Sequence, residues 1–157
     1  MMLDRIKQEF RRKGKLLAYA QPGDTGADER IRSNAYAEFR SFWANFGVSE
    51  NETEAARSIA VFVKDCGKKL VDLPFVRPDT PARGKLLHHE ERAMALARVA
   101  SVTFEALRDS KQEWPAKNRQ GILARLDTVR RFLGKSPNAS ECTRQFIRAI
   151  ETISRQF

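Results

Sequence analysis

The sequence predicts an all-α fold, a single-domain bundle of about six helices. Apolar residues recur every three or four positions along most of the 157 residues, and alternating runs of β-branched residues are missing. Glycines and prolines divide the chain into segments of helical length. The apolar content of 41% is sufficient for one core and no linker marks a second domain, so we expect residues 1–157 to form one helical domain.

Two helices are expected in the N-terminal third of the chain. The first, over residues 3–20, is weakened in its middle by Gly14 and ends at the turn residues Pro22 and Gly23. The second begins near Asp28 and ends at Gly47 in the C′ position. Its apolar face is the most aromatic in the chain, and we expect core burial rather than base stacking for Ile31, Ala35, Phe39, Phe42, Trp43 and Phe46.

A third and a fourth helix follow, separated by a proline-rich connection at residues 71–84. Ser49 and Glu52 have the spacing of a capping box, which predicts the start of the third helix. Thr80 and Pro81 predict the N-cap and first residue of a fourth helix that reaches about Glu113. The inward residues of these two helices are expected to be Ala56, Ile59, Val63, Cys66, Leu87, Met94, Ala97, Phe104 and Leu107.

The Trp114-Pro115 step separates the fourth helix from the fifth, and we expect a half-exposed indole at this corner. The fifth helix is predicted from Pro115 to Gly134, and the last begins at Ser136 or Asn138. The apolar stripe of the last helix reaches the final residue, which predicts a packed C-terminus, and consists of Phe146, Ile150, Ile153 and Phe157.

The formal charge of +9 is concentrated at the two ends of the chain. The N-terminal helix, residues 1–20, has a net charge of +4, and the C-terminal helices, residues 111–157, have +6, whereas residues 21–110 have −1. If the two ends meet in the fold, they form one basic surface.

The basic residues of the last helix are predicted to form an outward ridge. At ~100° per residue, Arg144, Arg148 and Arg155 lie opposite the apolar stripe. Guanidinium groups bind phosphate in a bidentate manner, so this ridge is suited to follow a nucleic-acid backbone. The alternative is a solvated face with local ion pairs to Glu141 and Glu151.

The first helix contains six basic residues and only two acidic ones, so we expect some of its cations to have no ion-pair partner within the helix. One of the six, Lys13, falls within the apolar stripe. In the fifth helix, Arg119 and Arg130 flank the apolar arc, where they are placed to anchor an interface. The predicted nucleic-acid-binding residues are Arg5, Arg11, Arg12, Lys15, Lys117, Arg119, Arg130, Arg131, Arg144, Arg148 and Arg155.

The sequence indicates no catalytic or metal site. His88 and His89 precede two glutamates, but adjacent helical residues point ~100° apart, whereas helical ligand pairs need a spacing of three or four. Phosphate-binding loops and nucleophile elbows are missing, and Cys66 and Cys142 fit small buried hydrophobes. We therefore predict a protein that is not an enzyme and has no cofactor.

Membrane association is not expected either. The apolar stripe of the first helix is narrow and contains no tryptophan, and no apolar run approaches the ~20 residues of a membrane span. Charged residues near the N-terminus occupy the place of a signal peptide's apolar core, so we expect a cytoplasmic protein.

These observations favour a non-catalytic accessory protein that contacts the phosphate backbone of RNA or DNA with little sequence specificity. In size, charge and all-helical character the chain resembles the small helical subunits of CRISPR effector complexes. This resemblance is one of architecture, implies a place in a larger nucleoprotein complex, and assigns no role to any residue. The alternative is a protein–protein interaction or assembly module, of a mobile element or a secretion system, that docks an acidic partner.

Overall fold

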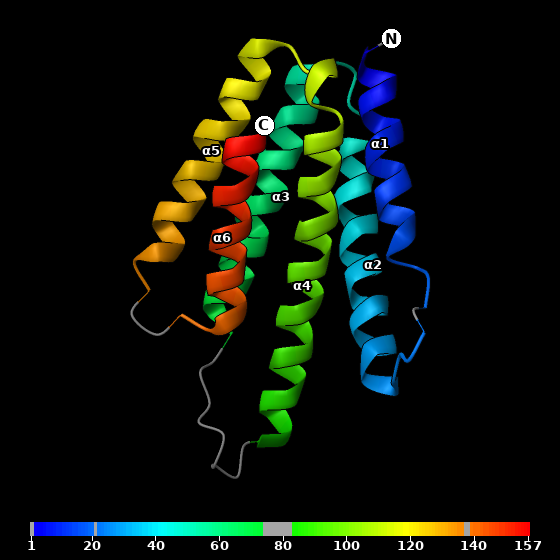
Figure 1. Ribbon diagram of the computed structural model, residues 1–157, viewed down its shortest axis with the longest axis vertical. Coiled ribbons are helices and arrows are strands. Elements are labelled where there is room, and N and C mark those ends of the chain that lie inside the picture. The colour runs from blue at the N-terminus through cyan, green and yellow to red at the C-terminus, as the bar shows by residue number, and fades with distance from the viewer. Residues whose placement is uncertain (1, 21, 74–82, 137–138) are drawn as a thin grey trace.

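In the part of the chain that the structure describes, six α-helices form one bundle, which confirms the predicted all-α class (Figure 1). The computed structural model describes residues 2–20, 22–73, 83–136 and 139–157, and for residues 83–88 it describes the backbone alone. No strand occurs in these ranges. The elements are α1 (Met2–Leu16), α2 (Gly26–Phe46), α3 (Glu52–Asp72), α4 (Arg83–Asp109), the short 3-10 helix η1 (Lys111–Glu113), α5 (Ala116–Gly134) and α6 (Glu141–Gln156).

Successive helices alternate in direction, and α4 lies in the middle of the bundle (Figure 1). It packs against α1 and α2 on one side and against α6 on the other, whereas α5 packs against α3 and α6. Helices α3 and α5 run parallel. Near their starts the Asn118 side-chain amide donates to Thr53 Oγ1 at 3.3 Å, and near their ends a β-carbon on Gly67 would lie 3.2 Å from Val129.

The aromatic face of α2 is buried in the core, as predicted, and two of its rings pack against Phe10 of α1. Phe39, Phe42 and Phe46 are buried, and Trp43 is partly buried against them. Gly14 has a packing role that the sequence did not reveal, because a β-carbon at this position would overlap the ring of Phe39. The glycine that was expected to weaken α1 therefore allows α1 and α2 to approach each other.

The predicted capping box at Ser49 and Glu52 is wrong. The N-cap of α3 is Asn51, whose side-chain oxygen accepts the backbone N–H of Glu54 at 2.9 Å. Ser49 is buried, and its carbonyl oxygen instead accepts a hydrogen bond from Lys7. A capping box does occur at the start of α2, between Thr25 and Asp28.

The long fourth helix ends earlier than predicted, at Asp109, and η1 leads to the turn at Trp114. Trp114 is 3% exposed, so the expectation of a half-exposed indole is wrong. Its ring N–H donates to Ser110 Oγ at 3.0 Å, which satisfies the polar atom of the buried indole. The prediction that Met94 points inward is also wrong, because its side chain is 41% exposed. Thr80, Pro81 and the side chain of Leu87 lie outside the described residues.

The ends of α2 and α5 and the start of α6 lie close to the predicted positions. Helix α2 ends at Phe46 with Gly47 as its right-handed C-cap, and α5 ends at Gly134 with Lys135 as C-cap. Helix α6 begins at Glu141 with Ser140 as N-cap, a few residues later than expected. Its apolar stripe is buried to the final residue, which confirms the packed C-terminus.

Candidate nucleic-acid interface

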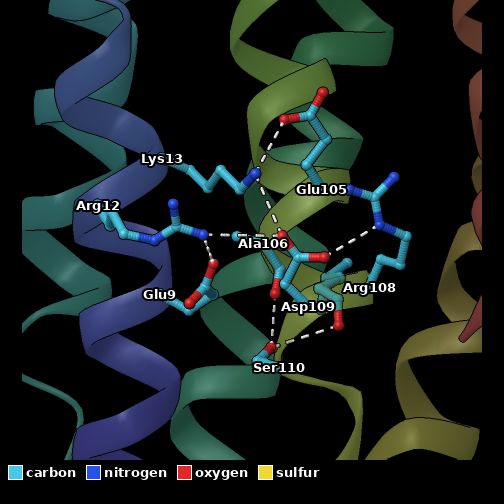
Figure 2. Close-up of polar contacts among 9 residues, drawn as sticks. Glu9, Arg12, Lys13, Glu105, Ala106, Arg108, Asp109 and Ser110 are labelled. Carbon is cyan, nitrogen blue, oxygen red and sulfur yellow. Dashed lines mark hydrogen bonds and ion pairs between the residues drawn. The ribbon is translucent and has the colours of Figure 1, made fainter.

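The basic side chains of α1 bind acidic residues of α4, far along the chain (Figure 2). Lys13 is 13% exposed, and its Nζ lies 3.1 Å from Asp109 Oδ2 and 3.4 Å from Glu105 Oε2. Arg12 pairs with Glu9 on its own helix and lies 3.9 Å from Asp109. Lys13 thus occupies the apolar stripe because α4 supplies two carboxylates for it.

Asp109 is the centre of this ionic network (Figure 2). Burial by itself raises the pKa of the carboxyl, but hydrogen bonds from Arg108 and Lys13 outweigh burial and hold the pKa below its ordinary value. The pKa of the Arg12 guanidinium is raised in turn, first by its hydrogen bond to Glu9. The network therefore joins α1 to α4 through an ionised carboxylate on α4 and protonated basic side chains on α1.

Two other basic residues of α1 also make contacts within the bundle. Arg5 lies 3.5 Å from Glu113 of η1, and Lys7 Nζ donates to the carbonyl oxygens of Gly47 at 2.9 Å and Ser49 at 2.6 Å. Lys7 thereby binds free carbonyls beyond the C-terminal end of α2. Contacts with residues distant in the sequence therefore neutralise much of the positive charge of α1 that acids within α1 cannot.

The basic N-terminal and C-terminal helices do not meet in one surface. Helix α1 lies on one flank of the bundle and α5 on the other, with α4 between them (Figure 1). The remaining predicted residues of α1, Arg11 and Lys15, are exposed and make no ion pair within the described residues. They face solvent far from the C-terminal helices.

The arginine ridge of α6 points outward as predicted, and it is partly neutralised by its own helix. Arg144 binds Glu141 at 2.9 Å, and Arg148 lies 3.9 Å from the same carboxylate. The pKa of Glu141 is lowered, chiefly by the hydrogen bond from Arg144. Arg155 and Glu151 form no ion pair among the described residues, so the alternative of local ion pairs holds for Glu141 and not for Glu151.

On α5, the predicted residues divide into paired and unpaired cations. Arg130 and Arg131 share Asp127, at 2.6 and 2.8 Å. Lys117 is exposed without an acidic partner in the described part of the chain. Arg119 is partly buried beside the apolar arc of α5, and its Nε is enclosed without a hydrogen-bond partner among the described residues, which is unusual for a buried polar atom.

The structure adds a stripe of cations on α3 that the sequence analysis missed. Arg57, Lys64 and Lys68 are exposed and lie seven and four positions apart, a spacing that places them on one side of a helix. None of them forms an ion pair with a described residue. Charge counting over residues 21–110 conceals this stripe, because α3 contains equal numbers of acids and bases. A helical projection of α3 alone would have found it.

These cations adjoin an unpaired arginine of α5. Asn118, Arg125 and Phe132 lie seven positions apart in turn, so they follow one line along α5, and Asn118 at its start contacts α3. Arg125 and Phe132 therefore follow the edge of α5 that borders α3. We call the exposed residues along this border the α3–α5 face: Lys64, Lys68, Arg125, Phe132 and Lys135.

Two of the four acids of α3 line a groove beside this face, and the other two, Glu52 and Asp72, form no ion pair with its cations. Glu54 and Asp65 line a groove between α3 and α2, which Arg57 also borders. On α5, Asp127 is already bound to its own arginines. The four cations of the α3–α5 face consequently form no ion pair with any described residue.

Neither a metal-ligating cluster nor a membrane-crossing helix occurs among the described residues. They contain no group of three or more metal-ligating side chains, and Glu91 binds Arg30 on α2 at 2.9 Å. None of their helices combines the length and apolarity that crossing a membrane requires. The side chain of His88 lies outside the described residues.

Comparison with known proteins gives no family for this chain. No family model, no curated protein and no solved structure matches it.

Proposed function

We propose that the protein is a non-catalytic nucleic-acid-binding accessory protein, and that it holds the phosphate backbone of its ligand on the α3–α5 face. The observation that supports this proposal is that the face presents four exposed cations without ion pairs on two packed, parallel helices. Cations already bound to acids must exchange one partner for another, whereas these four gain a partner when they bind phosphate.

The same arrangement explains the low sequence specificity that we propose. Lysine and arginine contacts to phosphate position a ligand without reading its bases. The face is a broad border between two helices that lie side by side, and it offers no single protruding helix for a major groove. Such a surface suits a small subunit of a larger nucleoprotein complex.

The arginines of α6 and of the outer side of α5 form a second region of contact in this proposal. Arg144, Arg148 and Arg131 are exposed but already share carboxylates with neighbours. We expect them to add less affinity per residue than the cations of the α3–α5 face. The cations of α1 lie on the opposite flank and are not part of the interface that we propose.

The test is binding of labelled RNA and DNA across a salt series, with charge-matched variants. The first variant combines Lys64→Ala, Lys68→Ala and Arg125→Ala. The control combines Arg11→Ala, Lys15→Ala and Arg40→Ala, which removes the same charge from exposed, unpaired residues outside the face. A third variant combines Arg144→Ala, Arg148→Ala and Arg155→Ala.

We expect the first variant to bind nucleic acid more weakly than the wild type. The magnitude of its slope of log K against log salt should be smaller by ~2–3, because each lost phosphate contact contributes ~0.7–0.9. The control should retain the wild-type slope, and the α6 variant should fall between the two. Absence of wild-type binding at ~50 mM salt would refute the proposal. Capture of an acidic polypeptide in place of nucleic acid would then support the alternative, an assembly module.

A further inference from the structure

One phenylalanine of this protein is placed differently from the others. Eight of the nine phenylalanines whose side chains are described are buried, whereas Phe132 is 49% exposed. Its ring is not paired with another described aromatic ring. Phe132 lies near the end of α5, on the α3–α5 face.

The surroundings of Phe132 are cationic. Lys135 follows it by three positions, which places the two side chains on one side of the helix end, and Arg125 precedes it by two turns. The β-carbon position of Gly67 on α3 contacts Leu133, so the neighbours of these two residues, Lys68 and Phe132, lie at the same level of the bundle. The exposed ring thus lies on the same helix side as two cations of α5 and at the level of a third cation on α3.

The outward side of α5 carries small side chains over the roughly three turns that precede this ring. A β-carbon on Gly121 would meet no atom within 4 Å, and the next outward positions of α5 are Ala124 and Thr128. Because these side chains are small, a chain that follows the cations is able to approach the helix backbone closely. From Arg125 to Lys135 the face extends ~15 Å, which corresponds to ~4 stacked nucleotides at ~3.4 Å each.

We infer that the ligand of the α3–α5 face is a single strand, with one unpaired base stacked on Phe132 and its flanking phosphates bound by Arg125, Lys68 and Lys135. This inference rests on the proposed function and specifies its ligand. Exposed aromatic rings within a cationic path are the means by which proteins hold single strands without reading sequence.

A duplex does not use this arrangement. Its bases are stacked on one another, and an aromatic side chain reaches a base face only if the base flips out or the ring inserts between base steps. Phe132 lies in the last turn of α5, which packs against α3, so insertion into a duplex would bring the ends of both helices against one groove. A duplex would bind by its phosphates alone.

The experiment compares a labelled single strand with the matching duplex at one salt concentration. The variants are Phe132→Leu, which keeps an apolar side chain without the ring, and Phe132→Trp, which keeps an aromatic ring. Tyr19→Leu is the control, because Tyr19 is a 61% exposed aromatic residue that follows α1 on the other flank. Thermal unfolding of each variant establishes that the fold is retained.

We expect Phe132→Leu to weaken single-strand binding ~10-fold, Phe132→Trp to retain it, and duplex binding to change less than twofold in either variant. Tyr19→Leu should bind both ligands as the wild type does. If wild type binds single strand and duplex equally and Phe132→Leu is silent, the inference is overturned while the proposed function stands. If wild type binds neither ligand at low salt, both are overturned.

Discussion

The ring of Phe39 on α2 occupies the space in which a β-carbon of Gly14 on α1 would lie. Replacement of a glycine by alanine inside a helix normally stabilises it by ~1 kcal/mol. Here the added methyl group would have to displace a buried ring that also packs against Phe42 and Trp43. Overpacking of this kind typically costs ~1–3 kcal/mol.

We therefore expect Gly14→Ala to reduce the free energy of unfolding by ~1–3 kcal/mol in denaturant titrations. Gly121→Ala is the matched control, because its added methyl group meets no atom within 4 Å. That variant should be neutral or more stable by up to ~1 kcal/mol. Equal effects of the two substitutions would contradict the close approach of α1 and α2 at Gly14.

The start of α3 provides a second test. Asn51 caps the helix with its side chain, so Asn51→Ala should destabilise the protein by ~1 kcal/mol. Ser49 has the sequence context of a capping residue, but its hydroxyl makes only a 3.5 Å contact to the carbonyl of Asn45. Ser49→Ala should therefore lower the free energy of unfolding less than Asn51→Ala does in the same denaturant titration. A larger loss for Ser49→Ala would indicate that Ser49 is the capping residue after all.

The ionic network at Asp109 predicts a dependence of stability on pH. Because the folded-state pKa of Asp109 lies below its ordinary 3.8, the ionised carboxylate stabilises the fold above that value. This contribution is lost as the pH falls through the folded-state pKa. The stability gap between wild type and Asp109→Asn should be constant from pH 7 to ~5 and should close below ~4.

Urea titrations at several pH values measure this gap. Asp65→Asn removes the same formal charge from an exposed residue without an ion pair and is the control. A gap for Asp109→Asn that persists unchanged to pH 2 would show that the carboxylate is not engaged by Lys13 and Arg108.

The two cysteines are expected to differ in reactivity. Burial raises the pKa of the Cys66 thiol to about 12, so at pH 8 only ~1 part in 10⁴ is the reactive thiolate. Burial also raises the pKa of Cys142, but this residue is only partly covered. A thiol reagent should label Cys142 first and Cys66 only on unfolding, and Cys142→Ser should abolish the fast phase.

Features that depend on local periodicity were predictable from the sequence. The apolar stripe of α6 and its opposite arginine ridge follow from a repeat of 3.6 residues, and both occur as predicted. Features that depend on contact between segments distant in the sequence could not be predicted. The partners of Lys13 are on α4, and the burial of Trp114 depends on packing around η1 that no local pattern specifies.

The candidate site shows the same division. Most cations of α5 and α6 were predicted as binding residues from the sequence, but Arg125 and Lys135 were not among them. Which of the predicted cations are already paired with an acid became visible only in three dimensions. The cations of α3 were overlooked because the prediction averaged charge over a long segment. The net charge of a segment does not record on which side of the helix each charged side chain lies, whereas a ligand contacts one side only.

The parallel course of α3 and α5 has a consequence for the choice of variants. Two helices that point the same way bring their C-terminal carbonyl ends together, and each end carries about half a negative charge. Lys69 and Arg131 lie in these last turns, so they offset the helix dipoles and contribute to folding as well as to surface charge. Lys64 and Arg125 lie before the last turns, where the dipole no longer acts on them. Substitutions at Lys64 and Arg125 therefore report on ligand affinity free of any effect on the helix ends.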